Sequence, residues 1–285
     1  MTDALNADGL PAIELTEEQK FIFDTRGWLA IPGVLSDADI IEMRDFAYQL
    51  AKDPDSIPED QRSTMGGPLQ RLTDHPIVVG FMNEFVAYDP LATADGYGFR
   101  HEGSFLTIRP WGPGNKEFTP HGGRGFFNFP GNHHTYHAMP DRVNSGLTRC
   151  VFELNEIREG DGGTLFLSGS HKGAFERPES TNQEDSPLWD TYSCPPGTVL
   201  FFTEAITHSG VAWKSKERER CAIFNCYNTI GSRWHQWSPP DAVLETLPPK
   251  RQSLYRPTWC DRNRVNPGDQ VHPGNAFVPN GATLA

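Results

Sequence analysis

Residues 197–213 read GTVLFFTEAITHSGVAW and decide the fold. Two short apolar runs, TVLFF and SGVAW, lie on either side of a segment that ends in His208, and the tight turn CPPG precedes them. Similar runs separated by turn residues follow one another from about residue 96: YGFRHEGSFLTI, LTRCVFELNEI, GGTLFLSG and RCAIFNCYN. Short strands at this spacing are typical of antiparallel sandwiches and jelly rolls. The sequence therefore predicts a mostly β fold.

A helical part precedes these strands. Thr16 can cap a short helix within LTEEQKFIFDTRG, and Gly27 can end it. WLAIPG, residues 28–33, is strand-like. Ser36 then opens SDADIIEMRDFAYQLAKD, whose apolar residues recur at helical spacing. We expect this second, amphipathic helix to pack on the β core.

Composition and these patterns predict one domain with two extensions. Residues 1–14 look like a polar tail. The domain spans residues 15–230, with a helical part at 15–60 and the β core at about 96–230. Residues 231–285, rich in Pro, Trp and Arg, are expected to pack over the core as an extension.

Charge and hydropathy favour a small-molecule substrate. The net charge is −12, from 25 basic and 37 acidic residues, without a basic cluster, which argues against nucleic acid and anionic membranes as partners. The longest apolar runs fall far short of the roughly 20 residues that span a bilayer, and the acidic N-terminus does not resemble a signal peptide. We expect a cytoplasmic protein.

The cysteines form no recognisable pattern. The five of them contain no CxxC pair, which indicates neither a disulfide framework nor a zinc knot. The sequence leaves the oligomeric state open.

Three segments, in order and spacing, resemble the phytanoyl-CoA dioxygenase family of iron(II)- and 2-oxoglutarate-dependent oxygenases. They are RGWLAIPGVLSDADI, FELNEIREGDGGTLFLSGSHKGAF and GTVLFFTEAITHSGVAW, and the resemblance covers about residues 16–228. It implies a double-stranded β-helix, a cupin-like jelly roll, with the helices flanking it. In this family a His-x-Asp/Glu pair and a later His hold Fe(II) at the barrel mouth. The remaining coordination positions then accept 2-oxoglutarate and O₂.

The resemblance assigns four residues to this site. His208 matches the distal histidine, and His121, which follows the strand SFLTI and a Pro/Gly linker, matches the proximal one. Arg220 matches the arginine that anchors 2-oxoglutarate a little over ten residues beyond the distal histidine. Arg218 is the reserve candidate, because strand alternation places it on the same face.

Gly123 departs from the family pattern, because it stands where the metal-binding carboxylate should be. In one interpretation another carboxylate of the chain binds the iron, and Asp141 is the best candidate. Glu204 is interpreted as structural, because four residues along a strand would separate it from His208 by about 13 Å. Asp161 is interpreted as a turn residue. A second interpretation places chloride on the iron, as in the halogenases of this class. A third places water or a substrate group there.

Other histidines compete with this interpretation. NHHTYH contains His133, His134 and His137, which we interpret as part of a lid loop, because the prolines around them disfavour a helix. His171 is expected to support the structure or the rim of the cleft. The sequence thus favours an oxygenase that hydroxylates an unactivated C–H bond. Halogenation is the main alternative; a non-catalytic binding module, or a zinc hydrolase that uses His121, His208 and Asp141, remains open.

Overall fold

The computed structural model describes residues 5–87, 92–112, 118–123 and 135–258. The strands are β1 (Trp28–Ile31), β2 (Phe99–Arg109), β3 (Tyr136–Met139), β4 (Arg142–Ser145), β5 (Thr148–Glu153), β6 (Gly163–Phe166), β7 (Thr198–Thr203), β8 (His208–Val211) and β9 (Arg220–Thr229). The α-helices are α1 (Glu17–Arg26), α2 (Asp37–Lys52), α3 (Pro76–Phe85), α4 (Asp241–Thr246) and α5 (Pro249–Gln252). Short 3₁₀ turns join them, among them η2 (Glu59–Gln61), η3 (Gly67–Leu72), η5 (Ser170–Lys172) and η7 (Ser253–Tyr255).

The first two helices begin and end where the sequence predicts. Thr16 caps α1 in a capping box with Gln19, and Gly27 ends it with a left-handed φ of 83°. Ser36 caps α2 by accepting a hydrogen bond from the Asp39 amide. These local signals confirm the expected helical N-terminal part.

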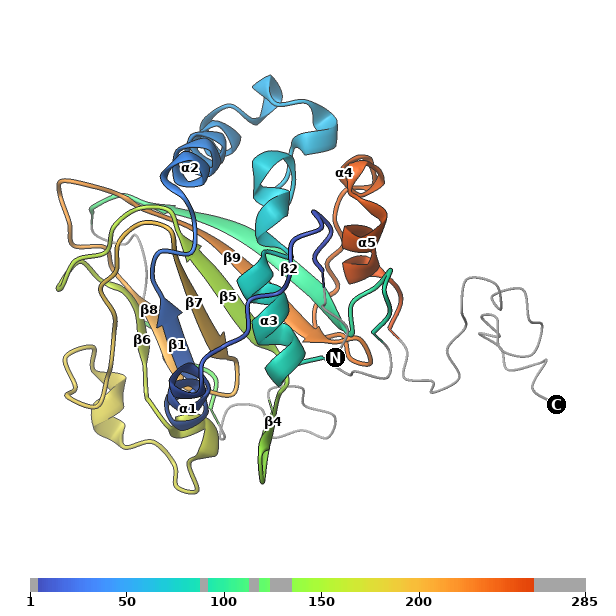
Figure 1. The fold of residues 1–285 in the computed structure, drawn as a ribbon. Coiled ribbons are helices and arrows are strands. Elements are labelled where there is room, and N and C mark those ends of the chain that lie inside the picture. Colours follow the sequence, from blue (N-terminus) through green and yellow to red (C-terminus); the bar gives the residue numbers. More distant parts are fainter. Residues whose placement is uncertain (1–4, 88–91, 113–117, 124–134, 259–285) are drawn as a thin grey trace.

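Two antiparallel sheets form the β core. The larger has the order β1-β7-β5-β9-β2 (Figure 1). The smaller pairs β6 with β8, and isolated bridges extend it on both sides, from His121 to His208 and from Phe166 to Asp190. Four chain segments therefore make up the second sheet. This arrangement is a double-stranded β-helix, so the predicted jelly roll is confirmed.

Strand alternation separates two faces of the larger sheet. Alternate side chains such as Phe152 and Phe201 pack against the helices, and the others, such as Val151 and Phe224, face the smaller sheet. Figure 1 shows α3 in front of the larger sheet and α4 and α5 beside β2. Residues that face the smaller sheet therefore line the inside of the barrel, where a site can be built.

The sequence analysis did not anticipate α3. Its segment PIVVGFMNEF is nearly all apolar, and seven of its residues are buried, so in the sequence it is a short apolar run that could form a helix or a strand. Phe81 stacks on Phe201 with 3.9 Å between ring centroids. A Cβ at Gly80 would collide with the carbonyl of Ile13. The N-terminal segment thus crosses α3 in direct contact.

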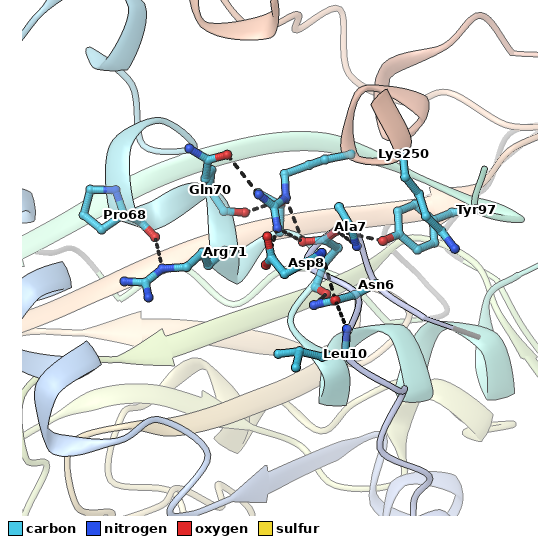
Figure 2. Close-up of polar contacts among 12 residues, drawn as sticks. Asn6, Ala7, Asp8, Leu10, Pro68, Gln70, Arg71, Tyr97 and Lys250 are labelled. Carbon is cyan, nitrogen blue, oxygen red and sulfur yellow. Dashed lines mark hydrogen bonds and ion pairs between the residues drawn. The ribbon is translucent and has the colours of Figure 1, made fainter. Parts of the chain in front are cut away.

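Residues 5–14, which composition suggests are a polar tail, are mostly exposed but make polar contacts with the core. Asp74 accepts hydrogen bonds from the Ala7 amide at 3.0 Å and from Tyr97 Oη at 2.7 Å. Arg251 donates to Asp74 at 2.8 Å and pairs with Asp8 at 2.7 Å. Figure 2 shows Ala7, Asp8 and Tyr97 within this network. The buried Asp74 therefore ties both ends of the described chain to the core.

Residues 231–258 pack beside the core. Val243 and Leu247 form a small apolar cluster with Met65, and Leu254 joins the main core. Residues 259–285 lie outside the described residues. No helix of the described part of the chain is long and apolar enough to cross a membrane.

Candidate functional site

His121 and His208 lie directly opposite each other on neighbouring segments of the smaller sheet. Their backbones exchange two hydrogen bonds, of 3.0 Å and 2.8 Å. In an antiparallel pair, opposite residues project from the same face. Their imidazole centroids are 4.2 Å apart. Although 87 residues separate them in the sequence, the fold brings the two predicted ligands together.

Both rings are held in the tautomer that a metal ligand needs. Nδ1 of His121 lies 2.8 Å from the Thr119 carbonyl oxygen, and Nδ1 of His208 lies 3.0 Å from the Ile206 carbonyl oxygen. A carbonyl only accepts, so Nδ1 of each ring carries a proton, and in a neutral ring Nε2 then carries the lone pair. Burial lowers the pKa of His208 to about 4. The ring is therefore neutral at neutral pH.

Gly122 and Gly123 let the His121 segment lie on the turn that precedes β8. Both have a left-handed φ, 77° and 75°. A Cβ at Gly122 would lie 2.9 Å from the Glu204 carbonyl and 3.2 Å from the His208 ring, and one at Gly123 would overlap Thr207 Oγ1. Glycine at position 123 is thus required by backbone conformation and by close contact, and the space beside it already holds Thr207.

Glu204 lies beside His208, which the sequence analysis did not expect. Its Oε2 is 3.7 Å from Nε2 of His208, and its Oε1 pairs with Arg149. The expected separation of about 13 Å assumed a continuous strand. That assumption was wrong, because β7 ends at Thr203 and a turn, closed by the 3.1 Å bond from Ile206 N to Thr203 O, precedes β8. A carboxylate therefore faces the distal histidine.

The structure does not bring Asp141 to the histidine pair. Asp141 occupies the exposed turn between β3 and β4 with φ of 59°. Short polar Asp tolerates this left-handed conformation, which gives the residue a local structural role. Within the described ranges, no three His, Cys, Asp or Glu side chains already stand at metal-binding separations.

Arg220 is the first residue of β9 and points into the barrel, where it is fully buried. Its Nε and Nη2 bind the two Glu153 carboxylate oxygens, at 3.2 Å and 2.5 Å, and Nη2 also donates to Tyr192 Oη at 3.0 Å. Burial alone would lower its pKa, but the Glu153 charge raises that pKa above the ordinary value. Nη1 makes no hydrogen bond to the described residues, which leaves one edge of the guanidinium for another acceptor.

Arg109 is a second cation at this place that the sequence analysis missed. It ends β2 opposite Arg220 in the strand register. Its Nη1 donates to the Val211 carbonyl at 3.1 Å. Partial burial and the Arg220 charge lower its pKa to about 10. Glu153 pairs with Arg220 and forms no ion pair with Arg109 in the described part of the chain, so this end of the barrel carries a surplus positive charge. Only the pairing of β2 with β9 reveals it.

Arg218 lies outside this cluster. It precedes β9, and its guanidinium pairs with Asp161 in the turn before β6. The expectation that Arg218 shares a strand face with Arg220 was wrong, because the strand begins only at Arg220. Asp161 is a turn residue as predicted, and it also accepts a hydrogen bond from the Arg158 amide at 2.7 Å.

A family model described as Phytanoyl-CoA dioxygenase (PhyH) matches residues 23–221, which include both histidines and Arg220. The chain belongs to the phytanoyl-CoA dioxygenase family. Membership places it among the iron- and 2-oxoglutarate-dependent oxygenases and confirms the resemblance found in the sequence. The sequence matches no curated protein significantly.

Solved structures share the fold of this family member. HygX from Streptomyces hygroscopicus, with nickel and 2-oxoglutarate bound, is 22% identical with a TM-score of 0.59, over 87% of this chain and 96% of that chain. SnoK, a carbocyclase from nogalamycin biosynthesis, is 16% identical with a TM-score of 0.55, over 90% and 96%. EctD from S. alaskensis is 19% identical with a TM-score of 0.54, over 79% and 82%. At these identities the likeness shows the fold alone.

The other histidines that the sequence analysis considered lie away from the pair of His121 and His208 or outside the described residues. Nε2 of His171 lies 2.9 Å from the Asp24 carbonyl, and its ring packs against Tyr136, so it supports the structure as expected. His137 is exposed on β3. His133 and His134 lie outside the described residues.

A surface cavity of about 510 Å³ lies between α2, η3 and the C-terminal helices, next to the network of Figure 2. It is lined by Arg71, Arg251 and several carboxylates. None of its lining residues belongs to the site of His121 and His208. The chemistry of the family therefore points to the barrel rather than to this cavity.

The residues of the barrel fit the cofactor and co-substrate of the family. Two histidine side chains suit iron(II), and the surplus cation suits a carboxylate. Val211, whose carbonyl accepts a hydrogen bond from Arg109, lies three residues beyond His208 on β8, which is about 10 Å along the strand.

Proposed function

We propose that this protein is an iron(II)- and 2-oxoglutarate-dependent dioxygenase that hydroxylates an unactivated C–H bond of a small molecule. The observation that carries the proposal is the pair His121 and His208, opposite each other with both Nδ1 atoms bound to carbonyls. Family membership supplies the reaction class. HygX, which shares the fold, has been crystallised with 2-oxoglutarate and hygromycin B. This supports a small-molecule substrate.

The side chains have distinct roles in this proposal. Nε2 of His121 and of His208 would hold the iron, and Arg220 Nη1 and Arg109 would hold the far carboxylate of 2-oxoglutarate. When bound, iron and 2-oxoglutarate supply the activation of O₂, with release of succinate and CO₂. Phe202 and Phe166 pack near the His208 ring, with centroids at 4.9 Å and 6.5 Å. These rings exclude water from one side of the histidine and keep it neutral.

The experiment is an anaerobic titration of the purified protein with Fe(II) and 2-oxoglutarate. We expect a metal-to-ligand charge-transfer band, which His208→Ala should abolish. The matched control is His137→Asn, which alters an exposed histidine outside the site. On admission of O₂, the wild type should form succinate.

Three alternatives predict different results. A non-catalytic module would give no charge-transfer band. A zinc hydrolase would contain zinc as purified and would not respond to 2-oxoglutarate. A halogenase would form the band, and chloride would change it and appear in the product. The structure adds no observation in favour of chloride, since Thr207 lies against Gly123.

A further inference from the structure

Three charged side chains gather at the Arg220 end of the barrel. Glu153 is the last residue of β5, Arg220 is the first of β9, and Arg109 is the last of β2. Arg109 lies opposite Arg220 in the strand register, and Glu153 binds Arg220. The side chains of Glu153 and Arg220 are at most 1% exposed. Water therefore screens these charges much less than it screens charges on the surface.

The carboxylate of Glu153 is directed at Arg220 and not at Arg109. Its two oxygens accept from Nε and Nη2 of Arg220. Tyr192 Oη donates to Oε1 of the same carboxylate at 2.7 Å and accepts from Arg220 Nη2 at 3.0 Å. The phenol thus holds the two partners of the ion pair together. One of the two guanidinium charges is offset inside the protein by this arrangement.

Arg109 keeps its charge without an acid of its own in the described ranges. Burial lowers its pKa most, the neighbouring charge of Arg220 lowers it further, and Glu153 raises it, to give about 10. Arg109 is therefore charged at neutral pH. Two positive charges and one negative charge leave this end of the barrel with one net positive charge. The far carboxylate of 2-oxoglutarate carries one negative charge, so the two are matched.

We propose that Glu153 is a specificity-determining residue of the co-substrate site, because it offsets one arginine charge and so selects a far group with one negative charge over a group with two. This inference rests on the proposed function, which places the far carboxylate at Arg220 and Arg109. A carboxylate there would balance the net charge. A phosphonate or phosphate would leave one negative charge without a partner in a buried place, which is unfavourable.

The test compares 2-oxoglutarate with 4-phosphono-2-oxobutanoate, in which a phosphonate replaces the far carboxylate. At about pH 8 the phosphonate carries mostly two negative charges. Both Kd values are measured by calorimetry with Ni(II) in the iron site, so that no turnover occurs. The readout is the Kd of the phosphonate divided by the Kd of 2-oxoglutarate. The two groups differ in size equally in every variant, so a change in this ratio reports the change in charge.

The ratio should follow the net charge of the site. A unit charge about 5–10 Å away changes an affinity by more than about tenfold at an effective dielectric constant of about 20. Glu153→Gln leaves two net positive charges and should lower the ratio by at least about tenfold. Arg109→Met leaves none and should raise the ratio by about as much. Arg109→Met/Glu153→Gln leaves one again and should return the ratio to near the wild-type value.

Two controls accompany these variants. Glu156→Gln removes an exposed carboxylate that is paired with Arg158, and it should leave the ratio unchanged. Arg109→Met keeps the buried pair of Glu153 and Arg220 intact, so it tests the same dependence on charge even if Glu153→Gln does not fold.

The possible outcomes separate this inference from the proposed function. If the Ni(II)-loaded wild type does not bind 2-oxoglutarate, both are overturned. If the wild type binds it but Arg109→Met changes neither Kd, the placement of the far carboxylate is wrong, and the inference is wrong with it. If Arg109→Met weakens 2-oxoglutarate binding but the ratio stays the same in all three variants, only the inference is overturned. A wild type that prefers the phosphonate would overturn it as well.

Discussion

Arg109→Met should weaken 2-oxoglutarate binding without destabilising the fold, whereas Arg220→Met should destabilise it strongly. Arg109 donates one hydrogen bond, to Val211, and its neighbour is the like charge of Arg220. Loss of such a bond costs about 0.5–1.5 kcal/mol, and relief of the repulsion offsets part of this. We therefore expect the free energy of unfolding to change by less than about 1 kcal/mol.

The affinity for 2-oxoglutarate should respond differently. A hydrogen bond to a charged group contributes about 1.5–3 kcal/mol. Removal of Arg109 should therefore raise the Kd by about 10- to 150-fold. The binding is measured by calorimetry with Ni(II) in the iron site, so that no turnover occurs.

Arg220→Met leaves Glu153 buried without its cation. Breaking a buried ion pair from one side costs about 3–5 kcal/mol. Arg220→Met/Glu153→Leu removes both charges and should recover much of that loss. Urea unfolding followed by tryptophan fluorescence measures these differences. An Arg109→Met protein with the wild-type Kd would refute the placement of Arg109 in the anchor, and a stable Arg220→Met would refute the reasoning about the pair.

Three further predictions concern positions outside the anchor. Gly123→Ala should lower the free energy of unfolding by at least about 1–2 kcal/mol, because residue 123 has a positive φ. A Cβ at position 123 would also overlap Thr207, so adding Thr207→Ala should recover only the cost of that contact. A double-mutant cycle measured by urea unfolding checks both values. Asp74→Asn leaves the buried Arg251 with Asp8 as its carboxylate partner and Gln70 as a neutral acceptor, so thermal unfolding should report a loss near the lower end of about 3–5 kcal/mol. Burial lowers the pKa of His171 to about 4, below its ordinary value of 6.5, so the unfolded state binds more protons between these values. Stability should fall as pH drops through this window, and His171→Asn should make that fall shallower; an unchanged slope would contradict the assignment.

The sequence located α1 and α2, whose signals are local. The caps at Thr16 and Ser36 act within one helical turn, and their helices formed where predicted. The helix α3 was missed because its ten residues are mostly apolar, and a short apolar run can be a buried strand as well as a buried helix. The sequence did not predict the contact of the N-terminal segment with the core, because Asp74 is 67 residues away from Ala7.

The sequence by itself determined the family and the jelly roll, and it proposed His121, His208 and Arg220 as site residues. Each is fixed by a short motif whose spacing is a property of the chain. The tertiary structure alone decided that Glu204 faces His208 and that Arg109 joins Arg220. The reason is physical. A turn replaced the expected strand at Glu204, and strand pairing brought together two arginines that are 111 residues apart, so neither contact is contained in any local pattern.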